Sequence, residues 1–133
     1  VLTPHPGELK RLIGSDPSRH TEEHFREFAT RFGNVLVIKR HRTLVTCGKR
    51  VYVNSTGNPG MATGGTGDVL TGVIAGFLAR GIEAFTAAAS AVCLHGMAGD
   101  AAAEKFTEEG MIATDLIDSL GEAWKNYTEY LSA

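Results

Sequence analysis

The sequence predicts a single α/β unit whose sheet is mostly parallel and ends in an antiparallel hairpin. Residues 35–38 are a continuous aliphatic run, which is typical of a strand covered on both faces, as in a parallel sheet. Two shorter runs, residues 43–46 and 51–53, lie on either side of Gly48-Lys49 and predict the hairpin. Helical patterns precede and follow these runs, so we expect helices and strands to pack in one domain.

Two helices are predicted before the aliphatic run. Residues 8–13 predict a short helix, because a proline stands in its first turn and a glycine follows its end. Residues 22–32 predict a second helix, with Thr21 as its N-cap and Gly33 at its end. The apolar positions of this second helix recur with the helical period, and they are Phe25, Phe28, Ala29 and Phe32.

Three more helices are predicted after residue 67. The first has a broad apolar face and ends near residue 80, and the second is rich in alanine and extends from about residue 83 to 105. Within it, His95 and Asp100 are interpreted as packing and solvent-side residues. Thr114 is the predicted N-cap of the last helix. We expect its buried stripe to consist of Leu116, Ile117, Leu120, Trp124, Tyr127 and Leu131.

Composition excludes several classes of protein. The 133 residues fit one domain, and the formal charge of -2 lacks the basic excess of nucleic-acid-binding proteins. No apolar run approaches the ~18 residues of a membrane span, and two separate cysteines make a disulfide framework or zinc site improbable. We therefore expect no nucleic acid or membrane partner and a cytoplasmic location. Val1-Leu2 resembles the end of a buried strand, so we expect this single unit, residues 1–133, to be part of a longer domain.

The glycine-rich segment before the third helix predicts a phosphate site. Gly64, Gly65 and Gly67 surround Thr66, and successive glycine amides can point into one concavity beside the positive end of a helix. The segment lacks the Lys-Ser or Lys-Thr pair of a Walker A loop and the G-x-G-x-x-G spacing of a Rossmann motif.

Asp68 follows these glycines directly. A carboxylate beside an anion site can act as the general base for a hydroxyl that attacks a phosphoryl group. The simpler alternative is that Asp68 only caps the helix. We favour the catalytic interpretation because the glycines are crowded immediately before it.

Two further segments carry candidate binding residues. Cationic side chains at the end of a buried strand can hold nucleotide phosphates, although such a run is usually a solvated turn. In this chain the run after residue 38 consists of Lys39, Arg40, His41 and Arg42, followed by Thr43. His5 lies between two prolines at a strand end, where the alternatives are a ligand contact and a turn histidine without a role.

Residues 58–72, Asn-Pro-Gly-Met-Ala-Thr-Gly-Gly-Thr-Gly-Asp-Val-Leu-Thr-Gly, resemble a signature of the ADP-dependent NAD(P)H-hydrate dehydratases, a branch of the ribokinase-like superfamily. Residues 3–8, Thr-Pro-His-Pro-Gly-Glu, are similar to the second signature of that family, and His95-Gly96 with Ala98-Gly99-Asp100 also matches its pattern. The resemblance extends from residue 1 to about residue 120. It implies a ribokinase-like three-layer fold, of which this chain is the C-terminal half.

The resemblance also implies an activity, the ADP- or ATP-dependent dehydration of hydrated NADH and NADPH with Mg²⁺. Asp68 then takes the proton of the hydrate's hydroxyl group while the 64–67 amides hold the phosphoryl group. It implies that His5 contacts the hydrate and that Lys39 and Thr43 contact the nucleotide, with Arg40 in place of the family's usual glycine. No residue of the chain is predicted as a metal ligand, and we expect a homo-oligomer. The alternatives are a small-molecule kinase of the same superfamily and a nucleotide-binding module without turnover.

Overall fold

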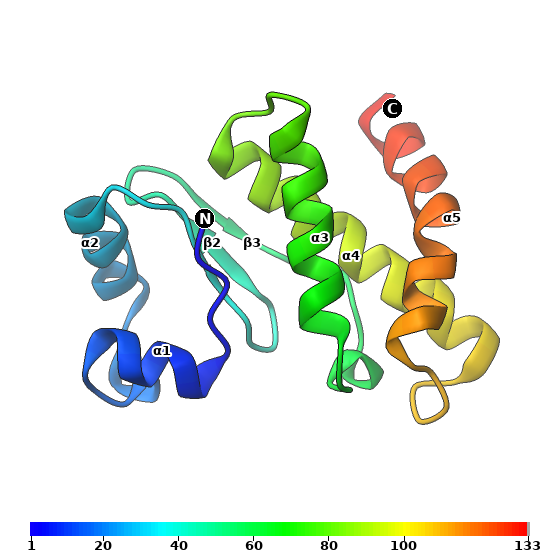
Figure 1. The fold of residues 1–133 in the computed structure, drawn as a ribbon, viewed down its shortest axis with the longest axis horizontal. Helices are drawn as coiled ribbons and strands as arrows, with labels where there is room; N and C mark the ends of the chain where they lie inside the picture. The colour runs from blue at the N-terminus through cyan, green and yellow to red at the C-terminus, as the bar shows by residue number, and fades with distance from the viewer. Residues whose placement is uncertain (133) are drawn as a thin grey trace.

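The computed structural model describes residues 1–132, except for the side chains of Tyr130 and Leu131. Five α-helices, three strands and two short 3₁₀ turns follow one another along the chain (Figure 1). In chain order they are α1 Pro6–Ile13, η1 Pro17–Arg19, α2 Glu22–Phe32, β1 Leu36–Ile38, β2 Leu44–Thr46, β3 Val51–Val53, η2 Pro59–Met61, α3 Thr66–Ala79, α4 Ala84–Phe106 and α5 Ala113–Ser132.

The three strands form one antiparallel sheet in the order β1-β2-β3. The predicted hairpin is confirmed, with Val45 opposite Tyr52. The prediction of a mostly parallel sheet is wrong for the described residues, because the short connections between these strands allow only antiparallel pairing. One parallel pairing is present, an isolated bridge between Leu2 and Leu36 on the other edge of β1. Since β1 has a partner on each side, its predicted interior position is confirmed.

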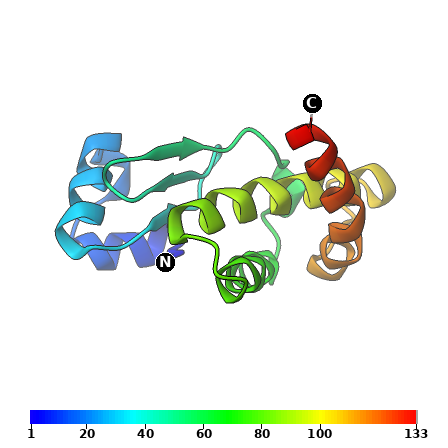
Figure 2. The ribbon, with the colours of Figure 1, turned by 90° about the horizontal axis from the view of Figure 1, so that it is seen from above.

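Helices cover both faces of the sheet. The side chains of Leu36, Ile38 and Leu44 are buried in a core with α1 and α2. Alternate residues belong to a second, larger core with α3, α4 and α5, and they are Val35, Val37 and Val45. Figure 2 shows that α4 lies between the hairpin and α3. The prediction that the aliphatic run is covered on both faces is therefore confirmed.

Most helix ends lie where the sequence predicts them. Gly14 and Gly33 end α1 and α2 with left-handed backbone angles, φ +76° and +60°, which favour glycine. The predicted N-cap of α5 is wrong, because the helix already begins at Ala113 and includes Thr114. Here the side chain of Asp115 accepts a 2.8 Å hydrogen bond from the backbone N–H of Ile112.

The buried stripe of α5 differs in part from the prediction. Leu116 is buried as expected, and Tyr127 is half-buried and donates a 2.9 Å hydrogen bond to Ser90 of α4. Ile117 and Trp124, however, are 49% and 38% exposed. Small residues of α5, Ser119 and Ala123, are buried instead, since the alanine-rich α4 allows a close approach. The side chain of Leu131 lies outside the described residues.

The start of α4 is held by an ion pair with the hairpin. The carboxylate of Glu83 accepts hydrogen bonds from the backbone N–H groups of Phe85 and Thr86. Arg50 donates to the same carboxylate at 2.7 Å, and its guanidinium lies 4.3 Å from the centre of the Phe85 ring. The backbone N–H of Phe85, with Arg50 and Thr86, lowers the pKa of Glu83 from 4.5 to about 2. No helix of the described residues is long and apolar enough to cross a membrane.

We predict that Glu83→Ala lowers the melting temperature at pH 7. A carboxylate whose pKa is depressed in the folded state stabilises that state above its unfolded pKa and loses this effect as the pH falls through its folded pKa. The difference between the variant and the parent protein should therefore shrink between pH 4.5 and about 2. Glu104→Ala, an exposed position on the same helix, is the matched control, and equal shifts in both variants would contradict the prediction.

Candidate functional site

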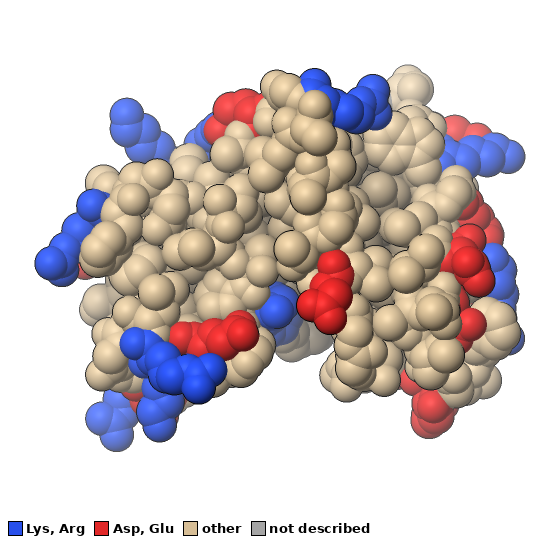
Figure 3. Space-filling model, in the orientation of Figure 1, with Lys and Arg blue, Asp and Glu red and all other residues tan. Residues whose placement is uncertain are grey.

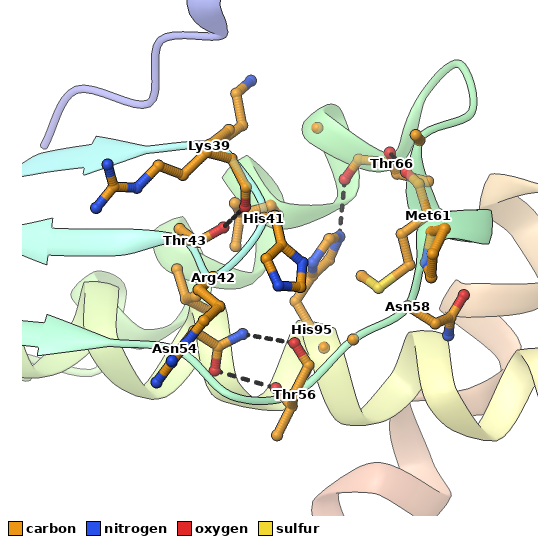
Figure 4. A pocket seen from close by; sticks show the side chains of 18 of the residues that line it. Lys39, His41, Arg42, Thr43, Asn54, Thr56, Asn58, Met61, Thr66 and His95 are labelled. Atoms are coloured by element: carbon orange, nitrogen blue, oxygen red, sulfur yellow. Dashed lines mark hydrogen bonds between the residues drawn. The ribbon is translucent and has the colours of Figure 1, made fainter. Parts of the chain in front are cut away.

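A cavity of about 680 Å³ lies between the end of β1, residues 54–62, the start of α3 and the middle of α4 (Figure 4). The surface is hollowed at the lower edge of the molecule, between the half that carries α1 and α2 and the half that carries α3 and α5 (Figure 3). Eight of the predicted site residues line this cavity, namely His5, Lys39, Arg40, His41, Arg42, Thr43, Thr66 and Gly67. The structure therefore gathers residues that are up to 62 positions apart in the chain (5 to 67). Gly64, Gly65 and Asp68 are adjacent in sequence but do not line it.

Lys39 brings a positive charge to the start of α3. It follows β1 directly, and its Nζ atom is so close to Gly67 that a Cβ atom there would lie 3.2 Å away. Within the described residues, the Lys39 ammonium has no hydrogen bond and no ion pair. The charge of Lys39 contributes to the lowered pKa of the Glu8 carboxyl. A cation beside the positive end of a helix is stabilised further by an anion between them, so this corner of the cavity fits a phosphate group.

The first turn of α3 presents free amides at the same corner. Gly65 occupies the N-cap with φ +92°, and its carbonyl oxygen accepts the helical hydrogen bonds of Asp68 and Val69. The amides of Thr66 and Gly67 precede these bonds and have no partner within the helix. The hydroxyl of Thr66 donates to carbonyl groups of the preceding loop, which fixes this turn.

Asp68 is not the N-cap of α3, because Gly65 holds that position. Its side chain is exposed in the first helical turn and makes no hydrogen bond or ion pair with another described residue. A capping carboxylate would accept a hydrogen bond from the helix. The Asp68 carboxylate accepts none from the described residues and lies in the helical turn that fits a phosphate, so it is available to accept a proton.

The loop after β1 has a strained backbone. Arg42 has φ +59°, in the left-handed region that favours glycine. Arg40, by contrast, stands outside that region, and its carbonyl oxygen accepts a 3.4 Å hydrogen bond from the Thr43 hydroxyl. Figure 4 shows Lys39, His41 and Thr43 on this loop beside the cavity. Strain of this kind costs about 1–3 kcal/mol and is concentrated at ligand sites.

His5 both lines the cavity and caps α1. Its Nδ1 atom accepts hydrogen bonds from the backbone N–H groups of Gly7 and Glu8, at 3.0 and 3.4 Å. In return, Glu8 accepts the backbone N–H of His5, and this bond lowers the pKa of the Glu8 carboxyl. The cap fixes the direction of the imidazole, so His5 has a structural role, and its binding role stays a prediction.

Sequence reasoning missed two site residues on α4. His95 lines the cavity, and its Nε2 atom lies 2.9 Å from the carbonyl oxygen of Thr66 (Figure 4). Asp100 accepts hydrogen bonds from Gly57 and Asn58 of the loop that precedes α3. His95 and Asp100 were interpreted as helix packing and solvent-side residues. The burial of His95 agrees with packing, whereas its place in the cavity wall and the contacts of Asp100 with the loop were not predicted. The available signals were the match of residues 95–100 to the family pattern and the glycines 96 and 99, since a glycine within a helix has a packing or functional reason.

The remaining aromatic and cysteine residues lie outside the cavity. Trp124, Tyr127, Cys47 and Cys93 do not line it. Both cysteines are free. Among residues 1–132, no group of three His, Cys, Asp or Glu side chains is arranged to hold a metal ion.

A three-layer fold with a cationic cavity at a helix N-terminus is typical of α/β proteins that bind phosphorylated small molecules. Comparison with known proteins narrows this class. The family model described as NAD(P)H-hydrate dehydratase matches residues 1–122, and this chain belongs to that family.

Curated relatives have related descriptions. The chain is 44% identical over 133 residues to a bifunctional NAD(P)H-hydrate repair enzyme from Moorella thermoacetica, an alignment that covers 97% of this chain and 25% of that enzyme. It is 42% identical over 104 residues to an ADP-dependent (S)-NAD(P)H-hydrate dehydratase from Neisseria meningitidis, covering 75% of this chain and 35% of that enzyme. The chain thus spans about a quarter to a third of these relatives' length.

Solved structures agree with the fold. An ADP/ATP-dependent NAD(P)H-hydrate dehydratase from Bacillus subtilis, co-crystallised with ATP and Mg²⁺, superimposes with a TM-score of 0.87 at 34% identity, over 95% of this chain and 47% of that one. A ribokinase-like superfamily protein from Enterococcus faecalis superimposes with a TM-score of 0.81 at 36% identity, over 94% of this chain and 43% of that one. The ribokinase-like character of the fold is thereby supported for about half of such a domain.

We predict that Lys39→Gln weakens the binding of inorganic triphosphate. Hydrogen bonds to charged groups contribute about 1.5–3 kcal/mol, so the dissociation constant measured by calorimetry should rise about tenfold or more. Lys49→Gln removes the same charge from the exposed turn between β2 and β3 and is the matched control. Equal weakening by both substitutions would indicate a general charge effect and no anion site at Lys39.

Proposed function

We propose that the complete protein dehydrates hydrated NADH and NADPH, with ADP or ATP as the phosphoryl donor. Membership of the NAD(P)H-hydrate dehydratase family supports the reaction type. The observation that carries the proposal is the unpaired ammonium of Lys39 against Gly67 at the start of α3, because the reaction needs a site for a transferring phosphoryl group.

The reaction proceeds in two balanced steps. The hydroxyl oxygen of the hydrate attacks the terminal phosphorus of ADP, AMP leaves, and Asp68 takes the hydroxyl proton. The carbon–oxygen bond then breaks, phosphate leaves with that oxygen, and a proton lost from the neighbouring ring carbon restores the double bond. With ATP the first leaving group is ADP.

The residues divide between the donor and the acceptor. The amides of Thr66 and Gly67 and the ammonium of Lys39 hold the phosphoryl group as negative charge builds on it, and Gly64 and Gly65 form the turn that leads to them. Residues 40–43 bind the remaining phosphates and the nucleoside, and the left-handed backbone at Arg42 turns this loop into the cavity. His5 lies on the side of α1 and contacts the hydrated nicotinamide.

The described residues fit Mg²⁺ only as a partner of the nucleotide. Mg²⁺ is usually held by substrate phosphates, waters and one or two carboxylates, and the chain has no cluster of three acidic or histidine groups within residues 1–132. The phosphate oxygens and waters would hold the ion, and Asp68 stays available as the base. Bound there, Mg²⁺ supplies charge neutralisation on the phosphates.

Incubating the complete protein with hydrated NADH and either ADP or ATP tests the proposal. Absorbance of the dihydronicotinamide should appear together with phosphate and with AMP or ADP. Release of a phosphorylated hydrate would overturn it in favour of a kinase. Binding of nucleotide without any turnover would favour a binding module.

Asp68→Asn tests the proposed base. Asparagine keeps the shape of the side chain, whereas general-base catalysis contributes about 10²–10⁴-fold, so turnover should fall by at least about 10²-fold. The affinity for ADP, measured by calorimetry, should stay equal or rise slightly because a negative charge is removed. Asp118→Asn on the exposed side of α5 is the control. Near-normal turnover would exclude Asp68 as the base, and joint loss of binding would indicate that it organises the loop or the metal.

His5→Asn separates substrate binding from helix capping. Asparagine is a good N-cap, so α1 should keep its first turn while the imidazole is lost. If His5 contacts the hydrate, the Michaelis constant for the hydrate rises more than turnover falls. His5→Ala, which loses the cap as well, provides the comparison for melting temperature. An unchanged Michaelis constant in His5→Asn would reduce the role of His5 to the cap.

A further inference from the structure

The middle of α4 contacts the loop before α3 at several points. Gly96 faces Thr56, and Gly99 faces Met61, so closely that a Cβ atom at either glycine would overlap the loop. The hydroxyl of Thr56 also donates a 2.9 Å hydrogen bond to the carbonyl oxygen of Cys93. The loop therefore lies directly on the backbone of α4.

His95 holds the far end of this loop. A carbonyl oxygen only accepts hydrogen bonds, so the 2.9 Å contact with Thr66 requires that His95 Nε2 carries a hydrogen. The imidazole is 9% exposed, and its burial, aided by the charge of Lys39, lowers its pKa, while the bond to Thr66 opposes this shift. A neutral imidazole thus donates to the first residue of α3 from inside the cavity wall.

Asp100 holds the near end of the loop. Its two carboxylate oxygens accept separate hydrogen bonds, one from the backbone N–H of Gly57 at 2.9 Å and one from the side-chain amide of Asn58 at 3.0 Å. The other side-chain atom of Asn58, Oδ1, accepts the backbone N–H of Gly60 and so caps the 3₁₀ turn η2. The carbonyl oxygen at the end of that turn, on Met61, accepts the hydroxyl of Thr66.

These contacts form one connected path from Asp100 through the loop to Thr66 and back to His95. We propose that His95 and Asp100 are positioning residues that clamp the loop from both ends and thereby place the Thr66 and Gly67 amides opposite Lys39. Neither residue needs to contact the phosphate for this effect. The consequence for turnover rests on the proposed function, whereas the effect on the loop and on anion binding does not.

Four variants of the complete protein test the clamp. His95→Leu removes the donor to Thr66, and His95→Gln restores an N–H group at the same reach. Asp100→Asn keeps the shape but places an amide N–H₂ group against one of the two loop donors. Glu104→Gln changes the same charge one turn further along α4, at an exposed side chain, and is the control.

Hydrogen exchange of the amides in residues 57–68 is the first measurement, with the hairpin, residues 44–53, as the internal reference. His95→Leu and Asp100→Asn should speed exchange of the loop about tenfold and leave the hairpin unchanged, because a lost partner leaves a polar group unsatisfied. The affinity for inorganic triphosphate should fall about threefold to tenfold in both variants. His95→Gln and Glu104→Gln should match the parent protein in both measurements.

Unchanged exchange and affinity in both His95→Leu and Asp100→Asn would overturn the clamp, as would a His95→Gln variant that loses as much as His95→Leu. If His95→Leu fails to fold, the isosteric Asp100→Asn variant still decides. Where the parent protein dehydrates the hydrate, both disruptive variants should lose about tenfold or more in turnover with a smaller change in the Michaelis constant for the nucleotide. A parent protein without dehydratase activity would overturn the proposed function and leave the exchange test valid.

Discussion

The candidate site depends on the close approach of one loop to one helix. Residues 56–61 can lie on α4 because Gly96 leaves room for the backbone of Thr56 and Gly99 leaves room for the side chain of Met61. An alanine at position 96 would displace the backbone of the loop, and the loop carries the chain to the first turn of α3. The contacts with α4 therefore set the direction in which the Thr66 and Gly67 amides point. Among the described residues of α4, His95 is the titratable side chain that lines the cavity. The glycines of α4 thus determine where the N–H groups of Thr66 and Gly67 lie on the opposite wall of the cavity.

The other half of the cavity is anchored in the sheet. β1 is buried on both faces, between a core with α1 and α2 and a core with α3, α4 and α5. Lys39 follows this strand directly, so its backbone starts from a rigid, dry element while its side chain reaches Gly67. Within the described residues the Lys39 ammonium has no hydrogen bond or ion pair, and it lies close to the positive end of α3. An anion that binds between these two positive groups therefore stabilises the folded protein.

The elements with local signals were predictable from the sequence, and the long-range geometry was not. Periodicity and glycine located the helices α1 to α4 and the hairpin, and the glycine motif located Thr66, Gly67 and the nearby Asp68. Burial on both faces of residues 35–38 was also evident, but the same pattern suits parallel and antiparallel neighbours, which is why strand direction was mistaken. His95 and Asp100 were missed because an alanine-rich helix appears buried on most sides, so its polar residues give no sign of which loop they contact.

The aromatic contact between α3 and α5 has a practical consequence. Trp124 is the single tryptophan of the chain, its ring centre lies 5.8 Å from that of Phe77, and the side chain is 38% exposed. It lies outside the cavity lining. The tryptophan fluorescence of this chain is therefore a reporter of helix packing in the α3–α5 layer. Its emission can follow unfolding of that layer in the presence of any ligand that does not absorb in the same range.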